Sequence, residues 1–402
     1  MTGERFNLRV LRLETRAAIA QAMAALGADP RGCEIMAPKG VFYRIHARGL
    51  KAAAAAILKQ EMLAKGGEAA VSRAAYGGTG EAGDVILMGT ETQFTAVCAT
   101  LAEQPFGLGA LGEEIRSLIR RMAAPPPPIK IGGREFDWGR RTYVMGIINA
   151  TPDSFSGDGL QRAANPVEAA VAQAEAMAAA GADLLDVGAE SSRPGHEPVS
   201  AEEELARLLP ILRALAGRVK LPISVDTSKA AVAEAALANG ASCLNDIWGL
   251  QRDPEMARVA ARAGVPVIAM HNHDGTDYAD LMGEIALFLR RSLEIAAAAG
   301  LPPEMAIVDP GIGFGKTREQ NLAVLRNLTE LRSLGRPILL GTSRKSVIGL
   351  TLDLPVGERA FGTAATVALG IAAGADIVRV HDVREMAQVT KMADAVVRSV
   401  EE

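Results

Sequence analysis

Short apolar runs alternate repeatedly with alanine-rich segments between residues 143 and 400 of this sequence. Each apolar run ends in a polar residue or a glycine. Runs of Val, Ile and Leu without polar alternation are typical of strands that are buried on both faces. About eight such units in about 260 residues is the size of a (β/α)8 barrel, also called a TIM barrel. The sequence therefore predicts an α/β fold built on this barrel.

The predicted strands span residues 143–149, 183–188, 222–226, 242–246, 265–271, 306–309, 338–341 and 376–381. The predicted helices span residues 166–180, 201–216, 230–239, 254–263, 278–299, 319–334, 358–373 and 385–400. The main alternative is an open doubly wound sheet, which would carry a glycine fingerprint after its first strand. The turn at that position reads Asn-Ala-Thr-Pro at residues 149–152, which favours the barrel.

A run of four prolines at residues 125–128 divides the chain, because it neither continues a helix nor pairs in a central strand. We expect residues 1–124 to form a small N-terminal α+β domain, residues 125–128 a linker, and residues 129–402 the barrel. The expected strands of the first domain are 7–14, 41–46 and 84–88, and the expected helices are 15–26, 50–65 and 91–103. Residues 129–137 predict a hairpin ahead of the barrel. No motif in residues 1–124 indicates an activity, and we favour a structural or oligomer-forming role for them.

Composition excludes several classes of protein. Hydrophobic residues make up 49% of the chain and charged residues 22%, which is typical of folded proteins and not of disordered ones. No run of about 18 uninterrupted apolar residues occurs, and the first residues lack an apolar signal core. The formal net charge of −4 does not fit a broad nucleic-acid-binding surface. Three distant cysteines without CxxC spacing favour a reducing compartment, so we expect a cytoplasmic protein without a zinc cluster or a membrane partner.

Polar or charged residues follow nearly every predicted strand of the barrel. The carboxyl ends of the strands surround the active site in this fold. A single such residue could simply cap the next helix, but capping does not explain a ring that mixes acids, amides and cations. The ring consists of Asn149, Asp186, Glu190, Asp226, Asn245, Asp246, His271, Asp309, Ser343, Arg344, Lys345, Arg379 and His381.

The cations of this ring indicate an anionic ligand. Lys345, Arg379 and His381 supply donors that suit phosphate oxygens. Asn149 together with nearby carboxylates would suit Mg²⁺, which prefers oxygen ligands and substrate phosphates.

The acids and amides of the ring indicate a polar ring compound. Asp226, Asn245 and Asp309 would be costly to bury unless each met a hydrogen-bonding partner, such as a nitrogen-rich heterocycle. No Ser-His-Asp or Cys-His arrangement is evident, so we do not expect a covalent intermediate. Residues 151–159 and 190–198 contain Gly, Ser, Pro and acidic residues and few apolar ones, and we expect them to be loops that cover the site.

Seven motifs, in this order along the chain, resemble those of dihydropteroate synthases. They are MGIINATPDSFS at 145–156, ESSRPG at 190–195, SVDT at 224–227, NDI at 245–247, DPGIGFGK at 309–316, SRKS at 343–346 and RVH at 379–381. The resemblance covers residue 129 to the C-terminus. It implies an Mg²⁺-dependent (β/α)8 barrel of folate biosynthesis that is the target of sulfonamides. The implied reaction condenses 6-hydroxymethyl-7,8-dihydropterin diphosphate with p-aminobenzoate and releases pyrophosphate and 7,8-dihydropteroate.

The resemblance also implies a role for individual residues. Those implied to hold the pterin ring are Asp226, Asn245, Asp309 and Lys345. Those implied at the diphosphate are Asn149, Arg379 and His381, of which Asn149 would also bind Mg²⁺. Those implied to frame p-aminobenzoate are Phe155, Ser192, Arg193, Pro194, Phe314 and Ser346. The expected catalytic residues are Asp226, Lys345, Asp158, Arg379 and His381.

Two positions depart from the family pattern. The first loop reads SGDG at 156–159 where many members have SDGG, so Asp158 is the candidate for contact with the incoming amine. Ser192 stands where threonine is common, which keeps the hydroxyl and removes a methyl group.

Two other functions fit part of the pattern. A corrinoid-linked methyltransferase has a similar pterin-binding barrel, but it has no diphosphate for Lys345, Arg379 and His381 to hold. A non-catalytic pterin-binding paralogue would not need the complete ring of polar residues. We expect small-molecule substrates, no nucleic acid, and a homodimer.

Overall fold

The computed structural model describes residues 7–73, 82–150, 165–190 and 199–398 of the chain. The chain divides into two compact units, Met1–Ala124 and Pro125–Glu402, and the boundary falls at the first residue of the proline run. Each unit has an apolar core of its own. Among the described residues, no helix is both long and apolar enough to cross a membrane.

The first unit is an α+β fold with three antiparallel strands in the order β1-β3-β2. The strands are β1 (Phe42–Leu50), β2 (Glu68–Val71) and β3 (Gly83–Thr90). The helices are α1 (Arg16–Ala25), α2 (Pro30–Gly40), α3 (Ala52–Ala64), α5 (Glu91–Leu101) and α6 (Leu108–Ala123). Leu58 of α3, Phe94 of α5, Ile115 of α6 and Leu87 of β3 belong to one cluster of buried residues.

The sequence predicts this unit less well than the barrel. The predicted strand at residues 7–14 is wrong, because these residues form no strand and the side chains of Leu8 and Val10 are 84% and 99% exposed. A β-favouring sequence does not form a strand without a neighbour to pair with. The helices α2 and α6 and the strand β2 were not expected. The signal for α2 is Asp29, which accepts a hydrogen bond from the Gly32 amide, followed by a proline in the first turn.

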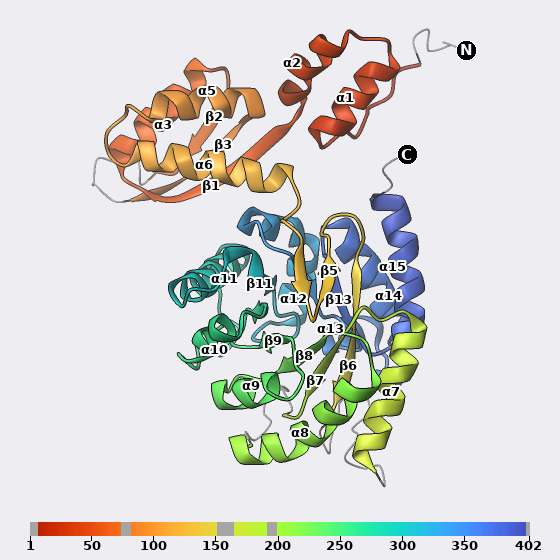
Figure 1. The fold of residues 1–402 in the computed structure, drawn as a ribbon. Helices are drawn as coiled ribbons and strands as arrows, with labels where there is room; N and C mark the ends of the chain where they lie inside the picture. The colour runs from red at the N-terminus through yellow and green to blue at the C-terminus, as the bar shows by residue number, and fades with distance from the viewer. Residues whose placement is uncertain (1–6, 74–81, 151–164, 191–198, 399–402) are drawn as a thin grey trace. The chain divides into compact units, whose positions relative to one another are not determined.

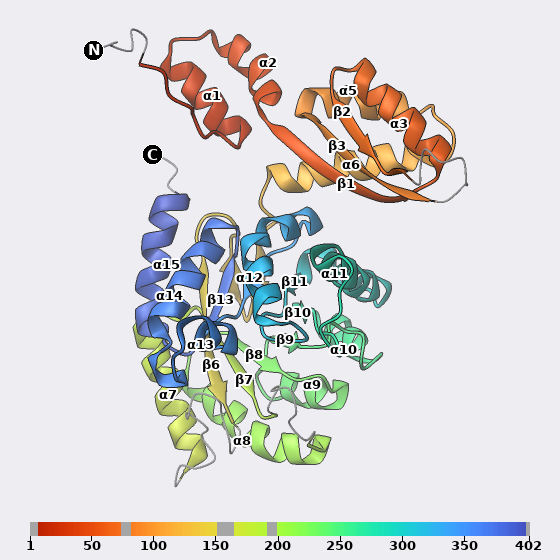
Figure 2. The same cartoon turned by 180° about the vertical axis from the view of Figure 1, so that it is seen from behind.

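The second unit is a closed barrel of parallel strands, which confirms the predicted fold. Eight strands follow the order β11-β10-β9-β8-β7-β6-β13-β12, and a bridge between Val308 and Ile338 joins the two ends (Figures 1 and 2). The barrel strands are β6 (Tyr143–Asn149), β7 (Leu184–Gly188), β8 (Ile223–Asp226), β9 (Cys243–Asp246), β10 (Val267–Met270), β11 (Ala306–Asp309), β12 (Leu339–Leu340) and β13 (Ile377–Val380).

Helices surround this barrel. They are α7 (Pro166–Ala180), α8 (Ala201–Arg218), α9 (Ala230–Leu237), α10 (Met256–Ala263), α11 (Leu281–Ala298), α12 (Arg318–Arg326), α13 (Ser346–Leu352), α14 (Ala360–Ala372) and α15 (Val383–Val397). Short 3-10 helices are η2 (Pro303–Met305), η3 (Leu328–Leu334) and η4 (Val356–Glu358). The predicted helix at 319–334 is therefore two elements, α12 and η3, and α13 was not expected.

The predicted hairpin, β4 (Ile129–Ile131) and β5 (Arg134–Phe136), joins the first apolar layer of the barrel interior. That layer contains two residues of β6 and one residue from each of six other strands, together with hairpin residues and Trp138. The strand residues are Tyr143 and Met145, Leu184, Cys243, Ile268, Ile307, Leu339 and Ile377. Because side chains alternate along a strand, the residues two positions further face the same interior. In β7, β9, β11 and β13 those residues are Asp186, Asn245, Asp309 and Arg379. The barrel interior thus changes from apolar to polar toward the carboxyl ends of the strands.

Candidate active site

Arg379 is the centre of the polar layer. Its Nε lies 2.6 Å from Asp186 Oδ2, and its Nη2 lies 3.0 Å from Asp226 Oδ2. Asn245 Nδ2 also donates to Asp186 Oδ2, at 3.0 Å. Four strands, β7, β8, β9 and β13, therefore supply one connected network. Two of its predicted members, Arg379 and Asp226, are in direct contact, and Asn245 reaches them through Asp186.

Asp186 is the member of this network for which the sequence analysis predicts no individual role. Its side chain is fully buried, and its Oδ1 has no hydrogen-bond partner among the described residues. The signal that could have found it is its register: it stands two residues after the inward-facing Leu184, as Arg379 stands two residues after Ile377. An acid and a base in the same interior layer are expected to pair, because neither can be buried alone at low cost.

Burial changes the proton affinity of the acids in this layer. It raises the pKa of Asp226 to about 7, although the charge of Arg379 acts to lower it. Burial also raises the pKa of Asp309, with the charge of Lys345 acting in the opposite direction. Asp309 Oδ1 accepts a hydrogen bond of 2.7 Å from the Gly311 amide.

Lys345 lies beside the same layer, at the end of the segment that follows β12. Its Nζ donates to the carbonyl of Ile312 at 2.5 Å and lies 4.7 Å from the ring centroid of Phe314. Burial lowers the pKa of Lys345 to about 8, while the charge of Asp309 opposes that shift. A Cβ atom at Gly313 would lie 3.2 Å from Lys345 Cδ, so the glycine gives the lysine stem room to cross this loop.

Lys316 stabilises the loop after β11 through hydrogen bonds to carbonyls of that same loop. Its Nζ donates to the carbonyls of Gly311 and Phe314, each at 3.0 Å, and lies 2.9 Å from His271 Nδ1. Burial lowers the pKa of Lys316 to about 7 and that of His271 to about 3. Residues 315–317 read Gly-Lys-Thr, as at the end of a phosphate-binding P-loop, but the ammonium group of Lys316 donates to carbonyls of its own loop. Lys316 thereby holds the loop that carries Phe314, whose ring lies beside Lys345.

The turn at residues 343–345 is fixed on two sides. Ser343 Oγ lies 2.9 Å from His381 Nδ1 and accepts the His381 amide at 3.1 Å. Arg344 has a positive φ of 56°, and its guanidinium makes a two-point ion pair with Asp382. His381 is thereby joined to the turn that carries Lys345.

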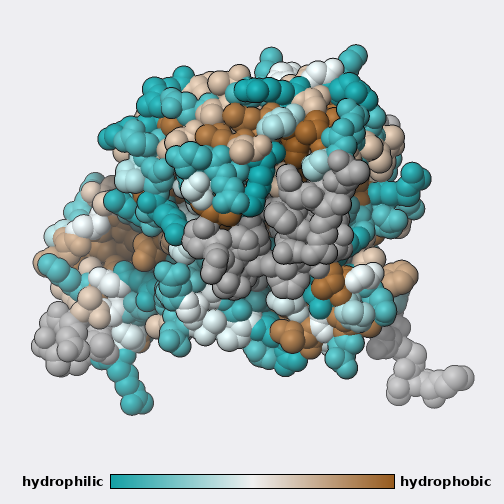
Figure 3. Space-filling model, turned by 90° about the horizontal axis from the view of Figure 1, so that it is seen from below, coloured by the Kyte–Doolittle hydropathy of each residue, from teal (hydrophilic) through white to brown (hydrophobic). Residues whose placement is uncertain are grey.

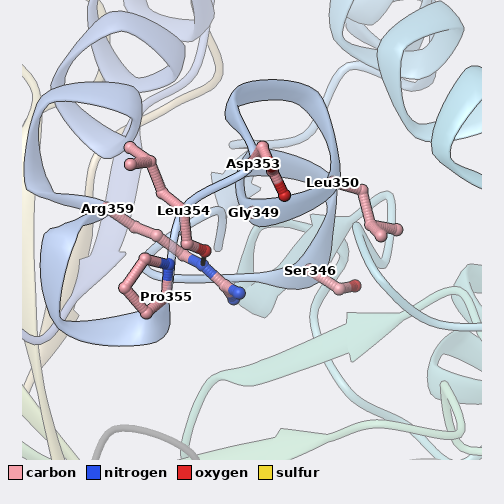
Figure 4. Close-up of a pocket in the computed structure, with 7 residues that line it drawn as sticks. All are labelled: Ser346, Gly349, Leu350, Asp353, Leu354, Pro355 and Arg359. Carbon is pink, nitrogen blue, oxygen red and sulfur yellow. Dashed lines mark hydrogen bonds between the residues drawn. The ribbon is translucent and has the colours of Figure 1, made fainter.

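Ser346 follows this turn as the exposed first residue of α13. It lines a pocket with a volume of about 480 Å³ (Figure 4). The other lining residues are Gly349, Leu350, Asp353, Leu354, Pro355 and Arg359. Arg359 donates to the carbonyls of Arg344 and Leu354, each at 3.0 Å, and a side chain at Gly349 would collide with its guanidinium.

Asn149 ends β6 at the same level as the acids. It pairs with Gly188 of β7, which in turn pairs with Asp226 of β8. Among the described residues there is no group of three or more His, Cys, Asp or Glu side chains that could hold a metal ion. The predicted residues Phe155, Asp158, Ser192, Arg193 and Pro194 lie outside the described residues.

The carboxyl ends of the barrel strands point to the lower side in Figure 1, and Figure 3 looks onto that side. The coloured residues around its centre are mainly hydrophilic, with apolar groups between them. The polar layer therefore lies at the end of the barrel where this fold places its catalytic residues.

Comparisons with known proteins identify relatives of the barrel. The family model described as pterin binding enzyme matches residues 145–381. The dihydropteroate synthase of Clostridium beijerinckii is 52% identical over 271 residues, which are 67% of this chain and 100% of that protein. A solved dihydropteroate synthase from Clostridium difficile, in the presence of pteroic acid, is 50% identical with a TM-score of 0.63 and covers 66% of this chain and 100% of that one.

A further relative extends the match beyond the barrel. It is a probable bifunctional folylpolyglutamate synthase/dihydropteroate synthase of Halobacterium salinarum, which is 40% identical over 374 residues. The match covers 91% of this chain and 44% of that protein, so it reaches into the first unit.

Proposed function

Because this chain belongs to the pterin-binding enzymes and, among them, to the dihydropteroate synthases, we propose that it makes 7,8-dihydropteroate for folate biosynthesis. The reaction joins 6-hydroxymethyl-7,8-dihydropterin diphosphate to p-aminobenzoate and releases pyrophosphate. The observation that carries the proposal is the buried network of Asp186, Asp226, Asn245 and Arg379 beside Asp309 and Lys345. Its carboxylates and amide match the donors and acceptors of a pterin ring.

The same residues can support departure of the diphosphate. When the bond between the pterin methylene carbon and the diphosphate oxygen breaks, the electron pair leaves with the oxygen and positive charge develops on the carbon. A carboxylate fixed in a buried site stabilises such charge, and Asp226 supplies one. The amine of p-aminobenzoate then attacks the carbon and loses its proton. We assign no base for that proton, because Asp158 lies outside the described residues.

The diphosphate would contact His381 and the Nη1 group of Arg379. The Nε and Nη2 groups of Arg379 are committed to Asp186 and Asp226, so Nη1 is the nitrogen that can turn to a phosphate oxygen without breaking those pairs. His381 is held at the neighbouring turn by Ser343, which orients its ring. We therefore assign two roles to Arg379. It positions Asp186 and Asp226, and it binds the departing diphosphate.

The described residues could bind Mg²⁺ only together with oxygen atoms of the substrate. They offer the Asn149 oxygen at the level of the acids, and they contain no cluster of acids that would form a protein-only site. Mg²⁺ commonly keeps several waters and binds through substrate phosphates plus one or two protein oxygens. We propose that Asn149 is such a ligand; when bound, the ion neutralises charge on the departing diphosphate.

The proposal is tested by pyrophosphate release from the full chain with the pterin diphosphate, p-aminobenzoate and Mg²⁺. We expect release to require all three and to stop when a chelator removes Mg²⁺. Release at the same rate without p-aminobenzoate would contradict a condensation.

We expect kcat/KM for the pterin diphosphate to rise and then fall between pH 5.5 and 9.5, because this parameter reports groups of the free enzyme. As the pH falls through about 7, Asp226 takes up a proton and loses the charge that stabilises the methylene carbon. As the pH rises through about 8, Lys345 loses its proton and its charge. The maximum should therefore lie between these values. A rate that does not change across this range would contradict the roles of both groups.

We propose that the chain forms a homodimer through α13, α14 and α15. Neighbouring helices of this set expose Leu350, Phe361, Leu369 and Met392, with Phe361 89% exposed and Leu369 67% exposed. Sedimentation should give twice the 42.0 kDa mass of one chain, and Phe361→Asp should give single chains.

The cysteines Cys33, Cys98 and Cys243 are buried and form no disulfide bond, which supports a cytoplasmic location.

A further inference from the structure

His271 is a buried member of the polar ring to which the proposed reaction gives no part. It comes directly after β10, and only 2% of its surface is exposed. Its Nδ1 lies 2.9 Å from Lys316 Nζ. Because an ammonium group can only donate, Nδ1 accepts this hydrogen bond and the ring is neutral. Burial lowers the pKa of His271 to about 3, so the ring stays neutral at physiological pH.

The ammonium group of Lys316 has three hydrogens and is given three acceptors, all of them uncharged. Two are the carbonyls of Gly311 and Phe314, each at 3.0 Å, and both belong to the same loop as the lysine. The third is His271, which comes from the end of β10, the strand that pairs with β11. His271 is therefore the acceptor that joins the loop after β11 to a neighbouring strand.

The backbones of the two segments are also in close contact. Gly311 and Gly315 have positive φ values of 68° and 53°. A Cβ atom at Gly311 would overlap the carbonyl of His271, and one at Gly315 would overlap the carbonyl of His273. Tyr278 Oη, further along the segment after β10, donates to the Gly315 carbonyl at 2.8 Å. Only glycine allows this approach, so the loop has one well-defined place against the segment after β10.

The same loop carries the two groups that lie against Lys345. The Ile312 carbonyl accepts from Lys345 Nζ at 2.5 Å, and the centroid of the Phe314 ring lies 4.7 Å from that nitrogen. Both residues lie between Gly311 and Lys316, which the ammonium group of Lys316 draws together. The place of the Lys345 ammonium therefore depends on the shape of this loop.

We infer that His271 is a positioning residue for Lys345, which acts through Lys316 on the loop after β11. The inference rests on the proposed function, in which Lys345 has its role. His271 needs no contact with either substrate. The position requires a neutral acceptor, because a protonated ring would leave one hydrogen of Lys316 without a partner and would place two positive charges side by side.

The kinetic test compares His271→Leu with His271→Asn in the full chain. Leucine has no acceptor, whereas the amide oxygen of asparagine can take the place of Nδ1. We expect His271→Leu to lower kcat/KM for the pterin diphosphate by about tenfold or more, because small misplacements of a site residue can cost that much. His271→Asn should stay within about threefold of the wild type. His46→Leu, at a histidine of β1 with a 46% exposed side chain, is the matched control and should leave kcat/KM unchanged.

A double-mutant cycle shows whether His271 acts through Lys345. In a Lys345→Ala chain, His271→Leu should lower kcat/KM by less than about twofold further, because the group that it positions is already gone. A merely structural role would give the same loss in both backgrounds. An unchanged kcat/KM in His271→Leu, an equal loss in His271→Asn, or a full additional loss in the Lys345→Ala chain would overturn the inference.

Hydrogen exchange gives a readout that does not need activity. The Phe314 amide donates to the Gly311 carbonyl within the loop. We expect it to exchange about tenfold faster in His271→Leu and in Lys316→Met, but not in His271→Asn, because the loop opens locally when the pair is lost. Unchanged exchange in both His271→Leu and Lys316→Met would also overturn the inference. A wild-type chain that makes no product would overturn the proposed function instead, while the exchange result would still decide whether His271 holds the loop.

Discussion

Lys345→Ala is expected to lower kcat/KM for the pterin diphosphate by about a thousandfold, which is the upper range for removing one fixed charge from a buried site. The ammonium group of Lys345 lies against the Phe314 ring and the Ile312 carbonyl. Alanine removes the charge, the donor and the cation–π contact in one step. Steady-state rates at several concentrations of the pterin diphosphate measure the effect.

Lys220→Ala is the matched control for this change. Lys220 is exposed and lies before β8, at the opposite end of the barrel from Lys345. The same substitution there should leave kcat/KM within about twofold, because exposed charges contribute little. Circular dichroism should show that both variants are folded. A Lys345→Ala enzyme that keeps a tenth of the wild-type rate would contradict the role given to this lysine.

Arg379→Met is expected to affect both stability and activity. It leaves Asp186 and Asp226 without the cation that pairs with both, and Asp186 is fully buried. Removing one partner of a buried ion pair typically costs about 3–5 kcal/mol of unfolding free energy. Turnover should fall by about a hundredfold or more, because Nη1 is also lost from the diphosphate. Urea unfolding and steady-state kinetics measure the two effects.

A second substitution separates these two effects. Asp186→Asn in the Arg379→Met chain removes one uncompensated charge, so part of the lost stability should return while turnover stays low. Arg218→Met, at an exposed pair with Glu175, should cost less than about 0.5 kcal/mol. Recovery of turnover together with stability would show that Arg379 matters for folding alone.

The barrel is predictable from the sequence because its pattern is repeated. Each strand is largely a run of apolar residues, and helices such as α7, α9 and α14 are rich in alanine, so an error at one boundary does not change the fold. The first unit has no such repeat. Its β2 strand is four residues long, and α2 contains an interior proline, Pro38, and two glycines that argue against a helix. There the structure depends on caps and packing partners that a single sequence does not reveal.

The candidate site is predictable as a set of residue types but not as a network. The register of β7 and β13 decides that Arg379 meets Asp186, and this register follows from which residues of each strand face the interior. Arg359, which holds the carbonyl of Arg344, comes from the start of α14, and no sequence spacing relates the two residues. Lys229 similarly meets Glu190 across two loops. Such pairs depend on tertiary structure, whereas the polar ends of strands follow from the fold class.

We propose that the polar layer of this barrel joins a pterin to p-aminobenzoate. Mass spectrometry of the pteridine product, with pyrophosphate measured in the same reaction, tests it most directly. We expect 7,8-dihydropteroate to form in a 1:1 ratio with pyrophosphate, and only when both organic substrates and Mg²⁺ are present. Pyrophosphate without dihydropteroate, or no consumption of the pterin diphosphate, would contradict it.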